Sequence, residues 1–306
     1  MGTRHAIVVR PEPEQDYVVY PGSAGLAWTQ DHLTLAFVYW QDHASAVSLD
    51  LEARQLAATS LGLAGYMFLD PFTVIAYDNW FAAAWVRWHI GDDKSLSIST
   101  SGSNVPDAGF AIYSRGFGAP TDYGASLTQL GESLVASATT QRSSSDIGQE
   151  EGPRCRYVVY GAAGELGSSS VLGACKGTHR LLGRSGHAVL VQAQSDGLKL
   201  ARINEQGQLT TPLLKIAPPS AESASILDAG PGLAGVLWSD GDAGHFVLID
   251  DTTLQALSNV VTFYASAGSR VANPLGVYSA GDLLAVFDRD GGADAIAAHC
   301  MASLPN

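Results

Sequence analysis

The stretch Leu233-Ala-Gly-Val-Leu-Trp-Ser-Asp-Gly-Asp-Ala-Gly-His-Phe-Val-Leu-Ile-Asp250 decides the fold of this 306-residue chain. Two apolar runs of strand length flank the segment Ser-Asp-Gly-Asp-Ala-Gly, where Asp and Gly supply the backbone conformations of a tight turn. The pattern therefore predicts a β-hairpin. Degenerate copies of the same pattern recur along the chain, and recurrence of this kind indicates a repeat architecture.

The second strand of each copy begins near residue 33, 73, 133, 187, 233 or 283, so the repeat is about 40 to 60 residues long. Each copy holds three or four strand-sized pieces bounded by turn signals. This spacing predicts an all-β fold, a six-bladed β-propeller of four-stranded blades that forms one domain over residues 1–306. The last copy lacks a fourth strand. We expect the N-terminal strand, His5–Arg10, to supply it by pairing with Ala295–His299, which closes the ring.

A two-domain β-sandwich is the competing architecture. It requires a linker near the middle of the chain, and residues 141–153, which are rich in Ser, Gly and Glu, are the one candidate for it. Under the propeller prediction the same residues form a long surface loop.

The composition suits short strands joined by many turns, because 15% of the residues are charged and 33 are Gly, against roughly 25% charged residues in a typical soluble domain. The net charge of −13 argues against a nucleic-acid partner, since a phosphate backbone would repel it. A cationic, neutral-sugar or protein partner fits better, and the acidity also serves solubility. No apolar run is long enough to span a bilayer.

Two of the three cysteines, Cys155 and Cys175, flank a segment that is typical of a hairpin. Strand pairing around Ala163–Glu165 would bring them roughly opposite each other, so we predict a disulfide between them. Two buried free thiols are the alternative. A disulfide implies an oxidising compartment and hence a secreted or periplasmic protein, although the first residues carry no signal-peptide pattern. Cys300 is expected to be a core residue.

Several strand ends resemble those of secreted bacterial β-propeller repeat proteins. The matching pieces are Leu237-Trp-Ser-Asp240 and Tyr39-Trp-Gln-Asp42, each followed by a strand that ends in Ile249-Asp250 or Leu49-Asp50, and Arg202-Ile-Asn-Glu-Gln-Gly207. The resemblance covers the first, fourth, fifth and sixth copies and fits the second and third poorly. It implies an architecture and no particular activity, because that group includes sugar-binding and scaffolding members and a minority of hydrolases and lyases.

The familiar signatures of nucleotide-binding, zinc-protease and serine-hydrolase sites are absent from the sequence. Asp288-Arg-Asp-Gly-Gly-Ala-Asp294 has the Asp spacing of a calcium loop, but a Gly-rich hairpin turn explains it better. Asp240, Asp242 and His245 form a similar cluster, which we interpret as the hairpin that every blade has. The sequence therefore predicts no metal site and no cofactor.

One exposed ligand site is predicted in the second copy, which matches the repeat pattern poorly. Trp80 follows Asp78 and Asn79 in a turn, and an aromatic ring beside a carboxylate and an amide suits a sugar face. Burial of Trp80 under residues 101–125 is the alternative. We therefore predict a non-catalytic binding or scaffold module for a protein or glycan. The alternative is a propeller hydrolase or lyase with a metal ion in the central channel.

Overall fold

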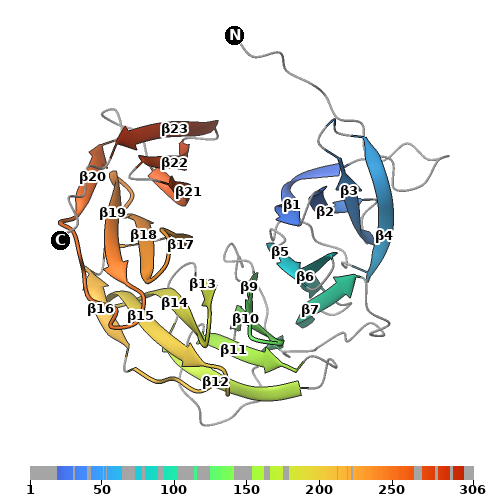
Figure 1. The fold of residues 1–306 in the computed structure, drawn as a ribbon, viewed down its shortest axis with the longest axis horizontal. Coiled ribbons are helices and arrows are strands. Elements are labelled where there is room, and N and C mark those ends of the chain that lie inside the picture. Colours follow the sequence, from blue (N-terminus) through green and yellow to red (C-terminus); the bar gives the residue numbers. More distant parts are fainter. Residues whose placement is uncertain are drawn as a thin grey trace. The chain divides into compact units, whose positions relative to one another are not determined.

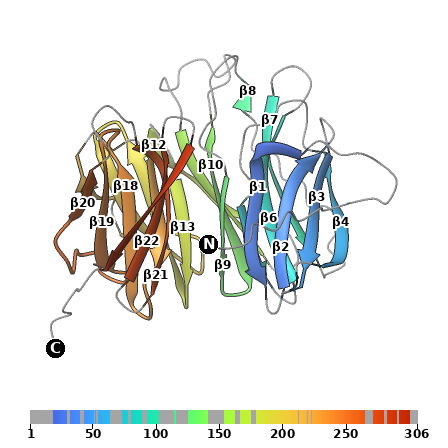
Figure 2. The same ribbon diagram turned by 90° about the horizontal axis from the view of Figure 1, so that it is seen from above.

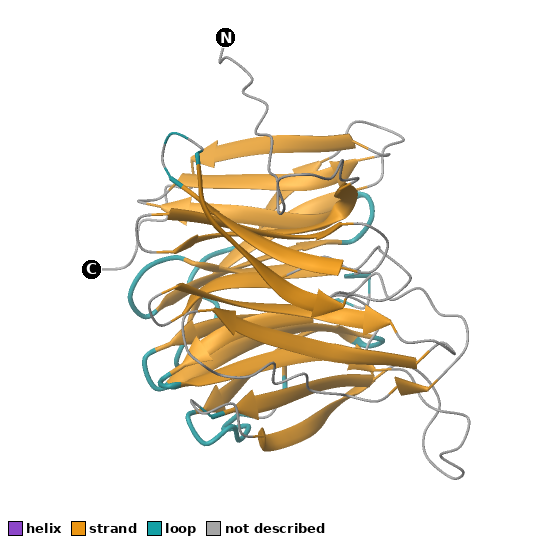
Figure 3. Ribbon diagram, turned by 90° about the vertical axis from the view of Figure 1, so that its right-hand side faces the viewer, coloured by secondary structure: helices purple, strands orange, loops and turns teal. Residues whose placement is uncertain are grey.

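The computed structural model consists of β-strands joined by turns and loops (Figure 3). It describes the following residues: 19–29, 32–39, 43–50, 52, 54–63, 73–77, 80–88, 93–101, 114–115, 125–140, 154–161, 166–174, 179–211, 213–218, 220–221, 223–264, 271–279, 282–289 and 292–299. These residues contain no α-helix, and accordingly none of them belongs to a helical membrane span.

The strands form antiparallel sheets that follow one another along the chain (Figure 1). The first sheet contains β1 (Val19–Thr29), β2 (His32–Tyr39), β3 (His43–Leu49) and β4 (Gln55–Leu63). The second contains β5 (Thr73–Tyr77), β6 (Trp80–Trp88), β7 (Asp93–Ser101) and β8 (Ser114–Arg115). The third contains β9 (Ala125–Leu130), β10 (Ser133–Thr140), β11 (Arg154–Tyr160) and β12 (Leu166–Ala174).

The fourth sheet contains β13 (His179–Arg184), β14 (His187–Gln194), β15 (Gly197–Asn204) and β16 (Leu214–Ala217). The fifth contains β17 (Ser223–Asp228), β18 (Leu233–Ser239), β19 (Ala243–Asp250) and β20 (Val261–Tyr264). The sixth contains β21 (Val271–Ser279), β22 (Asp282–Arg289) and β23 (Gly292–His299), so its described part has three strands where each of the others has four.

The chain divides into two compact units, Met1–Leu127 with Thr140–Glu150 and Thr128–Thr139 with Glu151–Asn306. In the first unit, the sheets that begin with β1 and β5 share a core around Phe81 and Trp85. Phe81 and Trp85 both lie on β6 and are buried.

Three apolar cores join successive sheets in the second unit. Tyr157 packs between the third and fourth sheets, Trp238 between the fourth and fifth, and Phe287 between the fifth and sixth. Figure 2 shows β18, β19 and β22 of the last two sheets side by side. This stacking of one sheet on the next is the packing that a repeat protein needs, because no single sheet can bury both of its faces alone.

The stretch that decides the fold forms the predicted hairpin. Leu233 lies opposite Asp250 at one end of the β18–β19 pair, and Ser239 lies opposite Gly244 at the other. Gly241 has a φ of 94°, which a side chain would disfavour. Gly244 is needed for a different reason, because a Cβ atom there would lie 2.3 Å from Cζ of Phe287. Gly244, the third Gly of the stretch, therefore makes room for the next sheet.

Candidate functional site

The recurrent Asp or Asn at the end of each matching third strand is a turn-forming residue. Oδ1 of Asp50 accepts hydrogen bonds from the backbone N–H groups of Glu52 and Arg54. Oδ1 of Asn204 accepts one from the N–H of Gln208, and Oδ1 of Asp250 accepts them from Thr252 and Thr253. These Asx turns connect the third strand to the segment that follows it. The motif thus encodes chain reversal.

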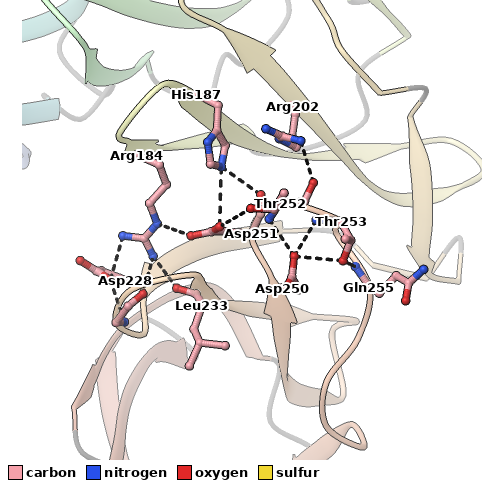
Figure 4. A network of polar contacts seen from close by, with 11 residues as sticks. Arg184, His187, Arg202, Asp228, Leu233, Asp250, Asp251, Thr252, Thr253 and Gln255 are labelled. Carbon is pink, nitrogen blue, oxygen red and sulfur yellow. Dashed lines mark hydrogen bonds and ion pairs between the residues drawn. The ribbon is translucent and has the colours of Figure 1, made fainter.

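A network of charged side chains joins the fourth and fifth sheets (Figure 4). Arg184, at the end of β13, donates from Nε to Oδ2 of Asp251 at 2.7 Å and forms an ion pair with Asp228 at 2.9 Å. It also donates to the backbone carbonyls of Gly230 and Leu233. All three guanidinium nitrogens of Arg184 have partners, and Asp251 is buried, so the network stabilises the contact between the two sheets. We call it the clasp.

His187 and Arg202 complete the clasp from the fourth sheet. Nε2 of His187 donates to the carbonyl oxygen of Asp251 at 3.0 Å, and Arg202 donates to the carbonyl oxygen of Thr252 at 2.8 Å. Hydrogen bonds from the neighbouring N–H group of Gly230 and from Arg184 outweigh the effect of partial burial, and they hold the pKa of Asp228 below its ordinary value. Asp228 is therefore ionised at neutral pH.

A second polar centre lies on the fifth sheet. Nε2 of His245 lies 3.0 Å from Oδ2 of Asp240, and Nδ1 lies 3.1 Å from Oγ1 of Thr262. The imidazole stacks on Trp238, with 5.2 Å between ring centroids and 21° between ring planes. We call Asp240, His245 and Thr262 the relay. Asp240 is the turn residue that the sequence predicts, whereas His245 lies on β19 and also contacts Thr262, which the sequence did not predict.

The carboxylate of the relay is fixed by its own turn. Its Oδ1 accepts hydrogen bonds from the backbone N–H groups of Asp242 at 3.2 Å and Ala243 at 2.9 Å. Partial burial works to raise the pKa of Asp240, but the hydrogen bonds from His245 and from these two N–H groups outweigh it. The net pKa is lowered, so Asp240 is ionised at neutral pH and its Oδ2 is available to orient the imidazole.

A third centre is a fully buried pair between the third and fourth sheets. Nδ1 of His179 lies 2.8 Å from Oγ of Ser137, and Nε2 has no hydrogen-bond partner among the described residues. Burial, together with the charge of Arg180, lowers the pKa of His179 to about 3. The ring is therefore neutral at physiological pH. Its lack of solvent contact makes it a core group, and no substrate can reach it.

An apolar segment is exposed on the outer edge of the fifth sheet. Leu257, Val260 and Val261 are 39%, 49% and 37% exposed. The chain pairs irregularly with β19 here, because Oγ of Ser258 takes the hydrogen bond from the N–H of Leu248 at 3.0 Å in place of a backbone carbonyl. Regular pairing resumes where Val261 lies opposite Phe246. We call residues 257–261 the outer-edge segment.

The predicted ligand site falls largely outside the described residues. Asp78 and Asn79 are not described, and of Trp80 only the backbone is. The backbone of Trp80 lies opposite Tyr77 at the start of β6, and the binding role of the three residues stays a prediction.

The predicted cysteine hairpin is confirmed, because β11 and β12 pair antiparallel with Cys155 opposite Gly173. Cys175, two residues further along, lies outside the described residues, as does Cys300. No disulfide occurs in the described part of the chain, and the bond between Cys155 and Cys175 stays a prediction. The hairpin pairing of Asp288 with Ala293 agrees with the interpretation of that stretch as a turn. No group of three or more metal-ligating side chains occurs among the described residues.

Comparison with known proteins supports the fold alone. No family model and no curated protein sequence matches the chain. Among solved structures, the Dos1 propeller is similar at 12% identity with a TM-score of 0.51, over 90% of this chain and 67% of that one.

Two further structures are similar at lower TM-scores. Cobalt-substituted Synechocystis ACO is 10% identical with a TM-score of 0.43, over 82% of this chain and 61% of that one. A prolyl endopeptidase is 14% identical with a TM-score of 0.47, over 91% of this chain and 42% of that one. The chain thus spans about two thirds or less of the length of these three structures. The likeness to the Dos1 propeller identifies a propeller-type fold, and membership of a secreted bacterial repeat family stays a prediction.

Proposed function

We propose that the chain is a non-catalytic binding or scaffold module, and that it binds a protein partner through the outer-edge segment. The observation that carries this proposal is the exposure of Leu257, Val260 and Val261, which lead into the edge strand β20 and include its first residue. Exposed apolar residues beside a strand edge favour addition of a strand from another protein, because the edge offers unpaired backbone groups.

Charge defines the partner further. The chain carries a net charge of −13, and Asp242 and Asp250 lie in the turns at the two ends of β19, the strand beside this edge. The pKa of Asp250 is held below its ordinary value mainly by the hydrogen bond from the N–H of Thr253, so it is ionised at neutral pH. A partner strand with alternating apolar residues and flanking Lys or Arg would complement this edge.

A displayed library of extended peptides with β-branched residues and flanking Lys tests the proposal. Peptides selected on the wild-type chain should lose most of their affinity for Val260→Glu in fluorescence anisotropy. Leu209→Glu is the control, because Leu209 is an exposed apolar residue, at 39% against 49% for Val260, in the segment that follows the third strand of the fourth sheet. Equal binding to Val260→Glu and the wild type, or no selectable peptide, would refute the proposal.

We also propose that the sheets are the six blades of one closed propeller, in which residues 5–10 pair with β23. The three-stranded described part of the sixth sheet supports this, since its β23 pairs with β22 alone among the described residues. Leu275, Val277 and Leu284 of the same sheet are 59%, 64% and 48% exposed, and such a face requires a cover in a stable fold. Removal of residues 2–11 should therefore lower the melting temperature and promote aggregation.

A secreted or periplasmic location is a further proposal, and it depends on the disulfide between Cys155 and Cys175. Mass spectrometry of the protein without reductant should detect the linked peptides. Three free thiols in protein from an oxidising compartment would remove this support. The glycan alternative depends on Asp78, Asn79 and Trp80, and it predicts that Trp80→Ala abolishes binding in a glycan array.

A further inference from the structure

The relay has the order of groups that activates a hydroxyl as a nucleophile. A carboxylate faces one nitrogen of the imidazole of His245, and the hydroxyl of Thr262 faces the other, at 3.0 and 3.1 Å. An ionised carboxylate accepts hydrogen bonds and donates none, so Nε2 must carry the proton. In the neutral ring, Nδ1 is then an acceptor and takes the hydrogen bond from the Thr262 hydroxyl. The nitrogen that faces the hydroxyl is thus unprotonated, as a general base toward a hydroxyl must be. Here that nitrogen is Nδ1, whereas in Ser-His-Asp triads it is Nε2.

Each member of the relay is held in place by the fifth sheet. Trp238, His245 and Thr262 lie directly opposite one another on β18, β19 and β20. The buried Trp238 supports the imidazole face, and the turn after β18 fixes the carboxylate of Asp240. A nucleophile and base that are positioned this firmly need little reorganisation before reaction.

The relay is also accessible, unlike the other hydroxyl–imidazole pair of the second unit. His245 and Asp240 retain 16% and 26% side-chain exposure, and Thr262 is half-buried. Ser137 and His179 have comparable geometry, but both are fully buried, and no carboxylate among the described residues faces Nε2 of His179. Thr262 also directly follows the outer-edge segment in the sequence.

We propose that Thr262 is an acyl-acceptor site that reacts once with an activated acyl ester. The Oγ1 atom of Thr262 forms a bond to the acyl carbonyl carbon, and the bond from that carbon to the leaving alkoxide breaks. The hydroxyl proton passes to Nδ1 of His245 and then to the alkoxide, which leaves as the alcohol. The product is an ester at Thr262. This inference is independent of the proposed function, because it depends on the relay and not on a protein partner.

Treatment of the full chain with p-nitrophenyl acetate tests the proposal. Peptide mass spectrometry should locate the acetyl group on Thr262, with stoichiometric release of p-nitrophenolate. Thr262→Ser should retain the reaction and Thr262→Val should lose it. His245→Gln should slow it roughly 100-fold, which is the lower end of what a general base contributes. Melting curves of the variants show whether each remains folded.

Thr252 serves as an internal control. Thr252 is exposed and lies beside a carboxylate, at 3.3 Å from Oδ1 of Asp251, but has no imidazole partner among the described residues. It should therefore react far more slowly than Thr262. Absence of acetyl-Thr262 in the wild type, acetylation of Thr252 at an equal rate, or an unchanged rate in folded His245→Gln would each overturn the proposal.

Discussion

Acidification should destabilise the protein through His179. The pKa of this buried ring is lowered from 6.5 to about 3 by burial, with a contribution from Arg180. Between these two values the unfolded chain binds a proton at this residue and the folded chain does not, so the free energy of unfolding falls as the pH falls. At pH 5, about 1.5 pH units below the unfolded pKa, the loss is roughly 2 kcal/mol at 1.4 kcal/mol per unit.

Urea unfolding, followed by tryptophan fluorescence at pH 7, 6 and 5, measures this loss. The matched variant is His179→Gln, whose amide can still hydrogen-bond Ser137 but does not titrate. The difference in unfolding free energy between wild type and variant should change by about 2 kcal/mol from pH 7 to pH 5. Parallel pH profiles would refute the reasoning. Should the variant fail to fold, NMR of the wild-type ring serves instead, and protonation of His179 above pH 5 in the folded state would be equally contradictory.

Three further substitutions test the packing of the second unit, each by urea unfolding. Gly244→Ala should cost about 1–3 kcal/mol, because the added Cβ overlaps the buried ring of Phe287; an unchanged midpoint would contradict this packing. Arg184→Leu should cost about 3–5 kcal/mol, since it removes the arginine charge that faces the buried Asp251, and adding Asp251→Leu should recover part of that loss. Val277→Thr should cost roughly 1–3 kcal/mol if a closed ring covers this face, whereas a change within about 0.5 kcal/mol would indicate a solvent-exposed face.

The hairpin motif was predictable from the sequence because its determinants are local. Asp240 and Gly241 form the turn that connects β18 to β19, and Asp250 starts the next turn through its own side chain. These interactions span four residues or fewer, so their pattern is visible in any short window. The same locality explains why the all-β class, the strand positions and the cysteine hairpin could be inferred.

The contacts between sheets could not be predicted in the same way. His179 pairs with Ser137 across 42 positions, and Arg184 pairs with Asp251 across 67. Neither pair has a spacing signature, because the repeat length varies between copies and the connecting loops differ. The one available signal was compositional, since an Arg or His within a strand that is otherwise apolar usually requires a partner in a neighbouring element.

The relay shows how one residue pattern can carry two consequences. Turn formation is sufficient to explain an Asp at position 240, and the sequence alone offered no reason to assign His245 a role. The proposed role of His245 as a general base depends on two features of the fold. Strand register places His245 opposite Thr262, and the turn directs Oδ2 of Asp240 toward the imidazole ring. His179 marks the opposite case. It also lies beside a hydroxyl, that of Ser137, but it is fully buried and faces no carboxylate among the described residues. It therefore affects stability alone. The two histidines should therefore separate experimentally, with His179→Gln altering the pH dependence of unfolding and His245→Gln altering acylation.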